Sequence, residues 1–530
     1  MIAASYNVLL EPWITAEEPG SGKRELGLLD TLAEAHALSG LYDPSPLVEC
    51  GLYRLLLALI LDAFHLTNLE AIEGLFQAKV FGRTVLEAYV ATVGRERFDL
   101  FDVEHPFLQS PAEVGRDDPV GPVVRLVQHL PSGTFATHFC HGGENEHAFS
   151  PAVCARGLAA IAPFMTSGGA GFSPSVNGMP PWYVLVRGGN LFETLVLNSA
   201  PLELFGDRDP MPPAWRRDGS VVPKEQRSCT SYLEALTWQP RRIRLLPEEG
   251  GVCTYTGEPT PVLVRRMVYT YGFRMSGEWT DPQVSYRYGP NGRRPLRPEE
   301  ERGLWRDTGP LTLLHEADYE GDKGKFRFQR PYVVRQRQTL VSDGLIDRTQ
   351  PLRIDAFGLR TDGHMKIFEW QHEELALPAE VLANTRAAAQ LQAAMDYAER
   401  IEYQLGRALK KAYPRNGEGN EQALDTVIWR AKRGYWNALQ RVFAAEYLVE
   451  LGAQDPEDAA APRALDARWD EQVRRLVRST FDAAVDSLDA DASALRRQVE
   501  ARSYLWRVTA PRRHEEFKAE TAANEREVVR

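Results

Sequence analysis

Two regimes of hydrophobic patterning divide the sequence near residue 375. Before that point, short alternating runs and many prolines and glycines surround a few stretches with helical spacing. Beyond it, apolar residues recur at helical spacing almost throughout. We therefore predict an α+β protein, with a large mixed α/β N-terminal domain over residues 1–374 and an all-α four-helix bundle over residues 375–530.

Within the first region the pattern predicts helices, strands and loops in separate places. Apolar residues at helical spacing predict helices over residues 28–39, 46–66, 67–81 and 82–94. Alternation of bulky and polar residues predicts strands over residues 182–187, 262–271 and 326–337. Richness in Pro, Arg and Gly predicts loops over residues 205–225 and 289–304.

The second region divides into four helical segments. They cover residues 378–413, 422–451, 463–489 and 492 to about 522. The run from Pro414 to Gly419 separates the first two, Gly452 ends the second, and Pro511 is expected to kink or restart the last. Four helices joined by short breaks favour an antiparallel bundle.

Charge and composition narrow the classes of function. The chain has 530 residues and a net charge of −11, which argues against indiscriminate nucleic-acid binding and leaves room only for a local basic patch. Five widely spaced cysteines are not the framework of a small secreted domain. The N-terminus lacks the pattern of a signal peptide, and the apolar run over residues 55–65 is too short to span a membrane. We expect a cytoplasmic protein without membrane contact.

Two segments partly match catalytic or phosphate-binding motifs, but each lacks a required residue or spacing. Gly20-Ser-Gly-Lys23 lacks the spacing of a phosphate-binding loop, and Gly171-Phe-Ser-Pro-Ser175 lacks the final glycine of a nucleophile elbow. The sequence has no HExxH motif, dinucleotide fingerprint or paired CxxC. We therefore predict a protein that is not an enzyme and that needs no cofactor.

One cluster contains the residue types that bind zinc. His138, Cys140 and His141 stand close to His147 and Cys154 in the sequence. Structural zinc sites use tight ligand pairs such as CxxC, which are absent here, so a solvated polar loop is the favoured interpretation and no metal is predicted.

Two further segments are candidates for contact with an anionic ligand. The run Ser167-Gly-Gly-Ala-Gly-Phe172 would let the main chain approach a ligand closely, although an ordinary turn explains it equally well. Residues 221–306 hold fourteen Lys and Arg against ten Asp and Glu, an excess that a solvated face also explains. The residues by themselves leave both alternatives open.

Taken in order along the chain, several segments resemble one protein family. They are residues 6–14 (YNVLLEPWI), 43–48 (DPSPLV), 53–57 (YRLLL) within the helix predicted over 46–66, 98–109 (FDLFDVEHPFLQ), 130–134 (LPSGT), the glycine-rich run, 186–188 (VRG) and 231–243 (SYLEALTWQPRRI). The set is collinear and resembles the CasA family, the large subunit of the type I-E CRISPR Cascade complex, over essentially the whole chain.

The resemblance implies a function in RNA-guided antiviral defence. Members recognise a protospacer-adjacent motif in double-stranded target DNA, mostly from the minor groove, and open the duplex so that crRNA pairs with it in an R-loop. The implied partners are the crRNA-containing Cascade subunits (the backbone, 5′-handle and small subunits) and a recruited helicase–nuclease. Base pairing then reads the target sequence, while the protein reads only the short motif.

The resemblance also implies which residues bind DNA. The family's glycine loop matches Gly169, Ala170, Gly171 and Phe172, with alanine where glycine is more usual. A loop that approaches the motif matches residues 134–142, with Phe139 and His141 as its contact residues. A wedge that splits the first base pairs matches residues 357–364, with Thr361, Asp362, Gly363 and His364 in its loop.

The sequence departs from the family pattern at three places. Relatives place glutamine in the wedge, and this loop has none. Relatives use a lysine finger where this chain has Thr270, so Arg265, Arg266 or Arg274 is expected to replace it. Some relatives carry two cysteine pairs suited to zinc, whereas Cys154 and Cys253 are one remaining member of each.

Two other functions are compatible with the residues. A metal-dependent nuclease or hydrolase would use His138, His141 and His147, and a purely architectural scaffold would use no residue to touch DNA. Cleavage of DNA by the purified chain with added metal separates the first from motif sensing, and unchanged DNA binding after substitution of the predicted loops separates the second.

Overall fold

The computed structural model describes most of the chain from Ala3 to Pro511. The exceptions are residues 21, 112–117, 131–145, 169–170, 207–210, 220, 290–291, 300–301, 313–317, 322–323, 363–365, 384, 414–419, 456–457, 459 and 487–491. The chain forms two compact units. The first comprises Met1–Leu304 and Pro310–Ala376, and the second comprises Trp305–Gly309 and Leu377–Arg530.

A buried helix lies at the centre of the first unit. Helix α2 (Pro46–Ala63) is buried from Leu47 onward on all sides, as its continuous apolar sequence predicts. It packs against α5 (Pro151–Phe164) so closely that a Cβ at Gly51 would lie 2.7 Å from the Ala159 carbonyl oxygen. The apolar run at residues 55–65 is therefore a core helix, and no described helix is long and apolar enough to cross a membrane.

Shorter helices complete this unit. Helices α1, α3 and α4 confirm the helical stretches predicted from periodicity at residues 28–94, with bounds of Leu28–Ala33, Leu69–Ala78 and Arg83–Val93. Asn68 caps α3, because its side-chain oxygen accepts the Ala71 N–H at 2.9 Å. The remaining helices are α6 (Leu191–Leu197), α7 (Tyr232–Leu236), α8 (Thr308–Thr312), whose last three residues belong here, and α9 (Tyr332–Ser342).

The described strands form five small sheets. Their orders are β2-β1-β3, β4-β8-β7, β11-β10-β13-β12, β15-β14-β5 and β6-β9. Strands β1 to β5 are Ile14–Glu17, Lys23–Leu26, Gly40–Leu41, Val120–Pro122 and Tyr183–Val186. Strands β6 to β10 are Gln226–Arg227, Arg241–Val252, Pro259–Tyr271, Arg274–Met275 and Tyr286–Gly289. Strands β11 to β15 are Gly292–Pro295, Asp318–Gly321, Gly324–Gln329, Leu352–Thr361 and Ile367–Leu377.

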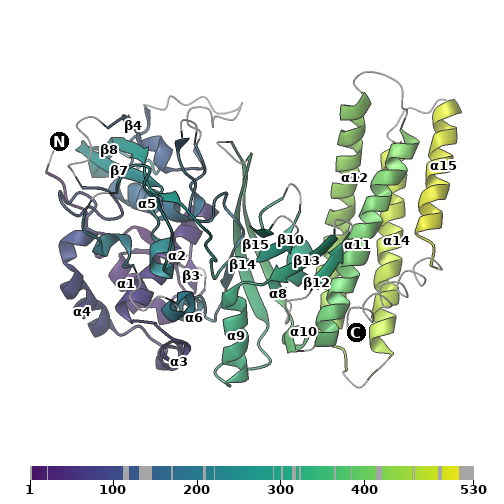
Figure 1. The fold of residues 1–530 in the computed structure, drawn as a ribbon, viewed down its shortest axis with the longest axis horizontal. Coiled ribbons are helices and arrows are strands. Elements are labelled where there is room, and N and C mark those ends of the chain that lie inside the picture. The colour runs from purple at the N-terminus through teal and green to yellow at the C-terminus, as the bar shows by residue number, and fades with distance from the viewer. Residues whose placement is uncertain are drawn as a thin grey trace. The chain divides into compact units, whose positions relative to one another are not determined.

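Two hairpins dominate these sheets. β7 and β8 pair antiparallel along nearly their whole length, with a register shift at Leu246/Pro247. β14 is hydrogen-bonded to β15 on one side and to β5 on the other, and Figure 1 shows β14 and β15 as long neighbouring strands. The predicted strands at residues 182–187 and 262–271 are thereby confirmed as β5 and β8.

Three local predictions are wrong. The strand predicted over residues 326–337 ends at Gln329, and α9 follows, because Pro331 cannot donate to a sheet and precedes a helix with Val333, Val334 and Leu340 on its buried face. The loop predicted over 289–304 contains β11. The wedge loop predicted over 357–364 is strand as far as Thr361.

The second unit is a four-helix bundle (Figure 1). Its long helices are α11 (Thr385–Ala412), α12 (Asn420–Val442), α14 (Ala461–Asp486) and α15 (Ala492–Val508). Helix α11 contacts the other three. The short helices α10 (Ala379–Ala383) and α13 (Leu448–Gly452) flank it, and one π-helical turn, Phe443–Tyr447, precedes α13. The predicted fold class is confirmed, although the grouping of Trp305–Gly309 with the bundle was not predicted.

A buried carboxyl group on α2 makes the stability of the first unit depend on pH. Glu49 is 7% exposed and lies near Asp355 of β14 and Arg187. Burial first, and then the charge of Asp355, raise the pKa of Glu49 to about 8. Because this pKa lies above that of an unfolded glutamate, the folded chain holds a proton that the unfolded chain has released, and stability falls as pH rises from about 4.3 to about 8.

We predict that Glu49→Gln removes this part of the pH dependence. The difference in unfolding free energy between variant and wild type should grow by about 3–5 kcal/mol between pH 4.5 and pH 8.5, in favour of the variant. Urea unfolding at both pH values measures it, with the exposed Glu87→Gln as the matched control. Identical pH dependence in wild type and Glu49→Gln would contradict the prediction.

Candidate nucleic-acid interface

A buried arginine holds both ends of the glycine-rich segment. Arg241, at the start of β7, is 4% exposed. Its Nη2 donates to the Thr166 carbonyl oxygen at 2.7 Å, and its Nη1 donates to the Ser173 carbonyl oxygen. The guanidinium therefore links the main chain on either side of the segment 167–172, and fixes the positions of Thr166 and Ser173, between which the segment runs.

Phe172 and two tyrosines surround this arginine. The Phe172 ring lies 4.7 Å from that of Tyr271 and 5.8 Å from that of Tyr269, centroid to centroid. The Arg241 guanidinium lies 4.6 Å from the Phe172 ring centroid, and its Nε donates to the Tyr269 hydroxyl at 3.1 Å. Tyr269 and Tyr271 share one face of β8 because they are two residues apart.

A lysine that the sequence analysis did not select joins these rings. The Lys224 ammonium lies 3.9 Å from the Tyr271 ring centroid. Its main-chain N–H donates to the Gly272 carbonyl oxygen at 3.0 Å, which fixes the segment that carries it. We call Phe172, Lys224, Arg241, Tyr269 and Tyr271 the Phe172 cluster.

Gly171 has a conformation that favours glycine. Its φ is +88°, and a Cβ added there would meet nothing within 4 Å. The segment is therefore open to solvent at Gly171, while the next residue, Phe172, is packed in the cluster. Gly169 and Ala170 lie outside the described residues.

The described side-chain contacts of the three arginines that the resemblance suggested do not include the Phe172 cluster. Arg265 is at the irregularity of the β7–β8 pairing, where its Nε is 3.5 Å from a Glu248 oxygen. Arg266 is exposed and shares the strand face of Thr270, opposite to that of Tyr269 and Tyr271. Arg274 is an exposed residue of β9 whose N–H donates to the Glu225 carbonyl oxygen. Arg241 at the Phe172 ring and Lys224 at the Tyr271 ring are thus the cations of the Phe172 cluster.

The predicted wedge is the tip of the β14–β15 hairpin. β14 ends at Thr361, and the Asp362 N–H donates to the Lys366 carbonyl oxygen at 3.1 Å. The Asp362 carboxylate accepts the Lys366 N–H at 3.0 Å, so this side chain closes the turn. Gly363 and His364 lie outside the described residues.

The other predicted contact loop is not described. Phe139 and His141, together with His138 of the alternative metal cluster, lie within residues 131–145. Of that histidine cluster only His147 is described, and its ring lies 5.8 Å from that of Phe149. The structure therefore does not bring these histidines together or separate them.

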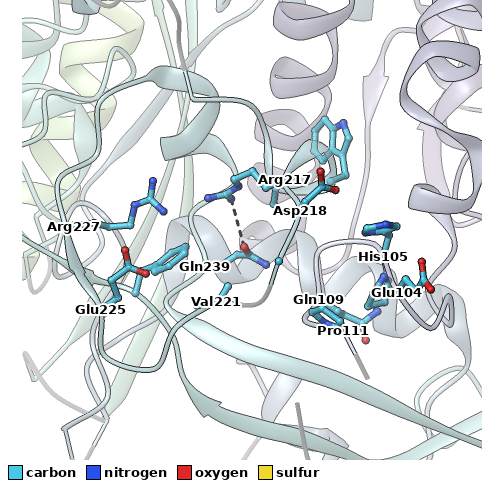
Figure 2. Close-up of a pocket in the computed structure, with 15 residues that line it drawn as sticks. Glu104, His105, Gln109, Pro111, Arg217, Asp218, Val221, Glu225, Arg227 and Gln239 are labelled. Carbon is cyan, nitrogen blue, oxygen red and sulfur yellow. Dashed lines mark hydrogen bonds between the residues drawn. The ribbon is translucent and has the colours of Figure 1, made fainter. Parts of the chain in front are cut away.

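A small cavity lies behind the segment that carries Lys224 (Figure 2). Its volume is about 140 Å³, and Glu225 and Arg227 line it from that segment. On the opposite wall, Nε and Nη1 of Arg217 are buried and have no hydrogen-bond partner among the described residues. Burial lowers the pKa of Arg217 to about 10. The cavity thus leaves free space next to the segment that carries Lys224.

Comparison with known proteins identifies the family. The sequence model of the family described as CRISPR-associated protein Cse1 matches residues 7–480. The chain belongs to the Cse1 family. The CRISPR-associated protein CasA/Cse1 of Thermus thermophilus is 28% identical over 476 residues, which cover 83% of this chain and 86% of that protein. The resemblance to the CasA family is thereby confirmed.

Solved Cse1 structures share the fold. The crystal structure of Cse1 from Acidimicrobium ferrooxidans matches with a TM-score of 0.73 and 24% identity, over 97% of this chain and 99% of that one. Thermus thermophilus CasA matches with a TM-score of 0.74 and 23% identity, over 95% and 99%. A chain of a CRISPR RNA-guided surveillance complex matches with a TM-score of 0.73 and 21% identity, over 95% and 100%.

The two cysteines that the Cse1 chain retains do not form a zinc site among the described residues. Cys154 and Cys253 are both buried and free, and Cys253 Sγ accepts the Ser150 N–H at 3.3 Å. Burial first, and then Cys253, raise the pKa of the Cys154 thiol, which disfavours the thiolate that zinc requires. Burial acts to raise the pKa of the Cys253 thiol as well, but hydrogen bonds from Thr256, Ser150 and Tyr255 outweigh it and lower that pKa. Two cysteines supply only half of the four ligands of a structural zinc ion.

One group of possible metal ligands exists elsewhere among the described residues. Asp355, His372 and Glu374 offer ligand atoms within 4.8 Å of one another on β14 and β15. The Arg187 guanidinium, however, lies 3.3 Å from an Asp355 oxygen, and the His372 ring stacks on Phe357 at 4.5 Å. The arginine already supplies the positive charge at this carboxylate, so the group is an ion pair within the hairpin base.

Proposed function

We propose that this chain is the subunit of an RNA-guided surveillance complex that senses a short motif in duplex DNA and opens the duplex beside it. The Phe172 cluster is the observation that carries the proposal, because Arg241 fixes a glycine-rich segment close to Lys224, which has no ion pair among the described residues. Membership of the Cse1 family supports it, as does the fold shared with a chain of a CRISPR RNA-guided surveillance complex.

The cluster has the chemistry that minor-groove recognition needs. The minor groove presents few distinguishing groups, so main-chain contacts from a glycine-rich segment suit a short and permissive motif. Lys224 supplies a positive charge next to that segment, where phosphates or groove acceptors would lie. A single local cation of this kind is compatible with a net charge of −11, because the other subunits of a nucleoprotein complex bring their own attraction to DNA.

We assign duplex opening to the β14–β15 hairpin. Pairing of β14 with β5 anchors the hairpin in the first unit, and the Asp362–Lys366 contacts close its turn. A wedge must be rigid, because a side chain that enters the base stack costs roughly a few kcal/mol per unstacked step. Of the four tip residues, His364 is the bulkiest and is our choice for the inserted side chain.

In this function the chain has no catalytic step of its own. Its partners are the double-stranded target DNA, the crRNA-containing Cascade subunits (the backbone, 5′-handle and small subunits) and a recruited helicase–nuclease. Guide pairing then supplies sequence specificity, and motif recognition by this chain allows that pairing to begin.

We predict that Lys224→Gln weakens binding of the assembled complex to motif-bearing duplex by about tenfold, and reduces the slope of log K against log salt by about 1. Lys79→Gln is the matched control, because Lys79 is also exposed and also has a φ of 60°. Affinity measured by electrophoretic mobility shift at several salt concentrations tests it. An equal loss for both variants would show a general charge effect and count against motif sensing.

A substrate comparison separates sensing and opening from other functions. Replacing Phe172 or His364 by alanine should weaken binding to motif-bearing duplex far more than binding to the same target as a single strand, because only the duplex needs reading and opening. Equal losses on both substrates would contradict the assignment of the wedge. Unchanged binding on both would favour a scaffold, and metal-dependent cleavage that His138→Ala with His141→Ala abolishes would favour a nuclease.

A further inference from the structure

A larger cavity lies in the first unit, apart from the Phe172 cluster. Its volume is about 600 Å³, which is within the range of small-molecule sites. It is lined by the segments 204–206, 229–230, 278–284 and 329–335. Its lining contains no residue of the Phe172 cluster or of the β14–β15 hairpin.

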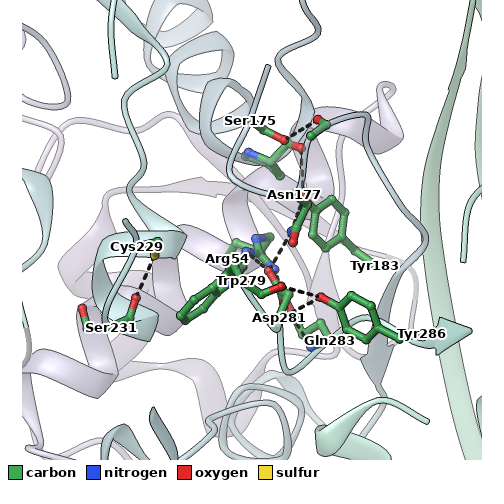
Figure 3. Close-up of polar contacts among 12 residues, drawn as sticks. Arg54, Ser175, Asn177, Tyr183, Cys229, Ser231, Trp279, Asp281, Gln283 and Tyr286 are labelled. Atoms are coloured by element: carbon green, nitrogen blue, oxygen red, sulfur yellow. Dashed lines mark hydrogen bonds and ion pairs between the residues drawn. The ribbon is translucent and has the colours of Figure 1, made fainter. Parts of the chain in front are cut away.

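The buried carboxylate at its wall is already neutralised (Figure 3). Asp281 accepts hydrogen bonds from Arg54 Nη2 at 2.8 Å and from Asn177 Nδ2 at 3.0 Å. The other carboxylate of the lining, Glu278, has a side chain that is 81% exposed and pairs with Arg293. Neither carboxylate is therefore left to balance positive charge inside the cavity.

Three donors of the lining have no acidic partner among the described residues. The Arg330 Nη1 and Trp279 Nε1 atoms are buried and have no hydrogen-bond partner there. Arg335 is exposed, faces the ring of Tyr332 at 5.3 Å from its centroid, and forms no described ion pair. A buried donor without an acceptor costs about 1–3 kcal/mol, and more when it is charged, so this arrangement calls for an explanation.

The positive charges of Arg330 and Arg335 also repel each other. Burial, and then the charge of Arg335, lower the pKa of Arg330 to about 10. Helix α9 adds to the positive potential, because it begins at Tyr332 in the lining and its N-terminal end bears a partial positive charge. One bound anion would offset the repulsion between the two arginines, interact favourably with the N-terminal end of α9 and accept hydrogen bonds from the unpaired donors.

We propose that this cavity binds a phosphate group, carried either by a free nucleotide or by a nucleic-acid strand. Arg330 and Arg335 would contact the phosphate oxygens, and the Trp279 indole N–H would donate to the same ligand. Two neighbouring guanidinium groups match a tetrahedral anion of high charge better than a single carboxylate. A volume of about 600 Å³ leaves room for the sugar and base that a phosphate carries.

The test measures ligand binding with three probes and two variants of the full chain. Inorganic phosphate, adenosine monophosphate and a single-stranded deoxyoligonucleotide without the motif are each titrated into wild type, Arg330→Gln and Trp279→Phe, by calorimetry and by thermal shift. We expect at least one probe to bind wild type and to bind at least tenfold more weakly to both variants. Arg348→Gln, which alters an exposed arginine of the same unit outside the lining, should bind like wild type.

The outcomes separate the source of the phosphate from failure of the proposal. Loss confined to phosphate and the mononucleotide identifies a free nucleotide, and loss confined to the oligonucleotide identifies a strand. Without ligand, Arg330→Gln should melt at or above the wild-type temperature, because it removes a partly buried charge that has no acidic partner among the described residues. A marked fall in that temperature, or equal binding by wild type and Arg330→Gln, would overturn the proposal.

Discussion

Asp281→Ala is expected to reduce the unfolding free energy of the chain by about 3–5 kcal/mol, the largest loss that we predict for a single substitution. The reason is what the substitution leaves behind. Arg54 on α2 is 1% exposed, and Asp281 is its ionic partner at 2.8 Å. Removal of the carboxylate leaves a guanidinium in the core with only the Gln283 side-chain oxygen, at 2.6 Å, as a described side-chain acceptor.

A double variant distinguishes this mechanism from simple loss of packing. Arg54→Met with Asp281→Leu removes both charges and keeps apolar volume, so it should cost less than Asp281→Ala alone. Urea unfolding measures both. Glu87→Ala, which breaks the exposed Arg83–Glu87 pair, is the control and should change stability by about 0.5 kcal/mol or less. If the double variant is the less stable one, the charge argument is wrong.

Arg241→Ala is expected to cost about 3 kcal/mol of stability and to weaken motif recognition by at least tenfold. The stability loss follows from the charged hydrogen bonds to the Thr166 and Ser173 carbonyl oxygens, each contributing about 1.5–3 kcal/mol, less what water recovers. The recognition loss follows because the glycine-rich segment between those two residues would no longer have a fixed base.

Hydrogen exchange separates the two effects. Arg241→Ala should accelerate exchange over residues 166–173 well beyond any change in α2, because the clamp acts locally. Arg348→Ala, which alters an exposed arginine of the same unit outside the predicted DNA-binding residues, is the control and should leave both exchange and motif affinity near wild type. A uniform rise in exchange across the first unit would mean that Arg241 supports the whole core and has no local function.

The sequence predicts an element well where a helix has one apolar and one polar face. The bundle helices and the helix at residues 46–66 follow such spacing or an unbroken apolar run, and the structure confirms them. It fails for α5, whose residues are buried on nearly every side, so that the apolar and polar alternation that marks a helix is absent. It also fails at residues 332–337, where a helix face resembles strand alternation over a short window.

The candidate site was predictable only in part, for a different reason. Glycine-rich composition and family resemblance pointed to Gly171 and Phe172. Nothing local pointed to Lys224 or Arg241, because they contact residues far away along the chain: Lys224 lies against Tyr271, and Arg241 donates to the Thr166 carbonyl oxygen, 75 residues earlier. The resemblance led to Arg265, Arg266 or Arg274 as the substitute for the family's lysine finger, and a DNA contact by any of them stays a prediction.

The short segment Trp305–Gly309 shows that a boundary in sequence differs from a boundary in folding. The Trp305 ring lies 4.9 Å from Phe443 and 5.5 Å from Trp436, and the Arg306 guanidinium lies 3.7 Å from the Trp436 ring centroid. A fragment that begins at Leu377 would keep every long helix of the bundle and still lack this plug for its core. The polypeptide therefore enters the bundle, leaves it and returns. The core of the bundle is complete only when a segment that precedes its long helices in the chain has packed against them.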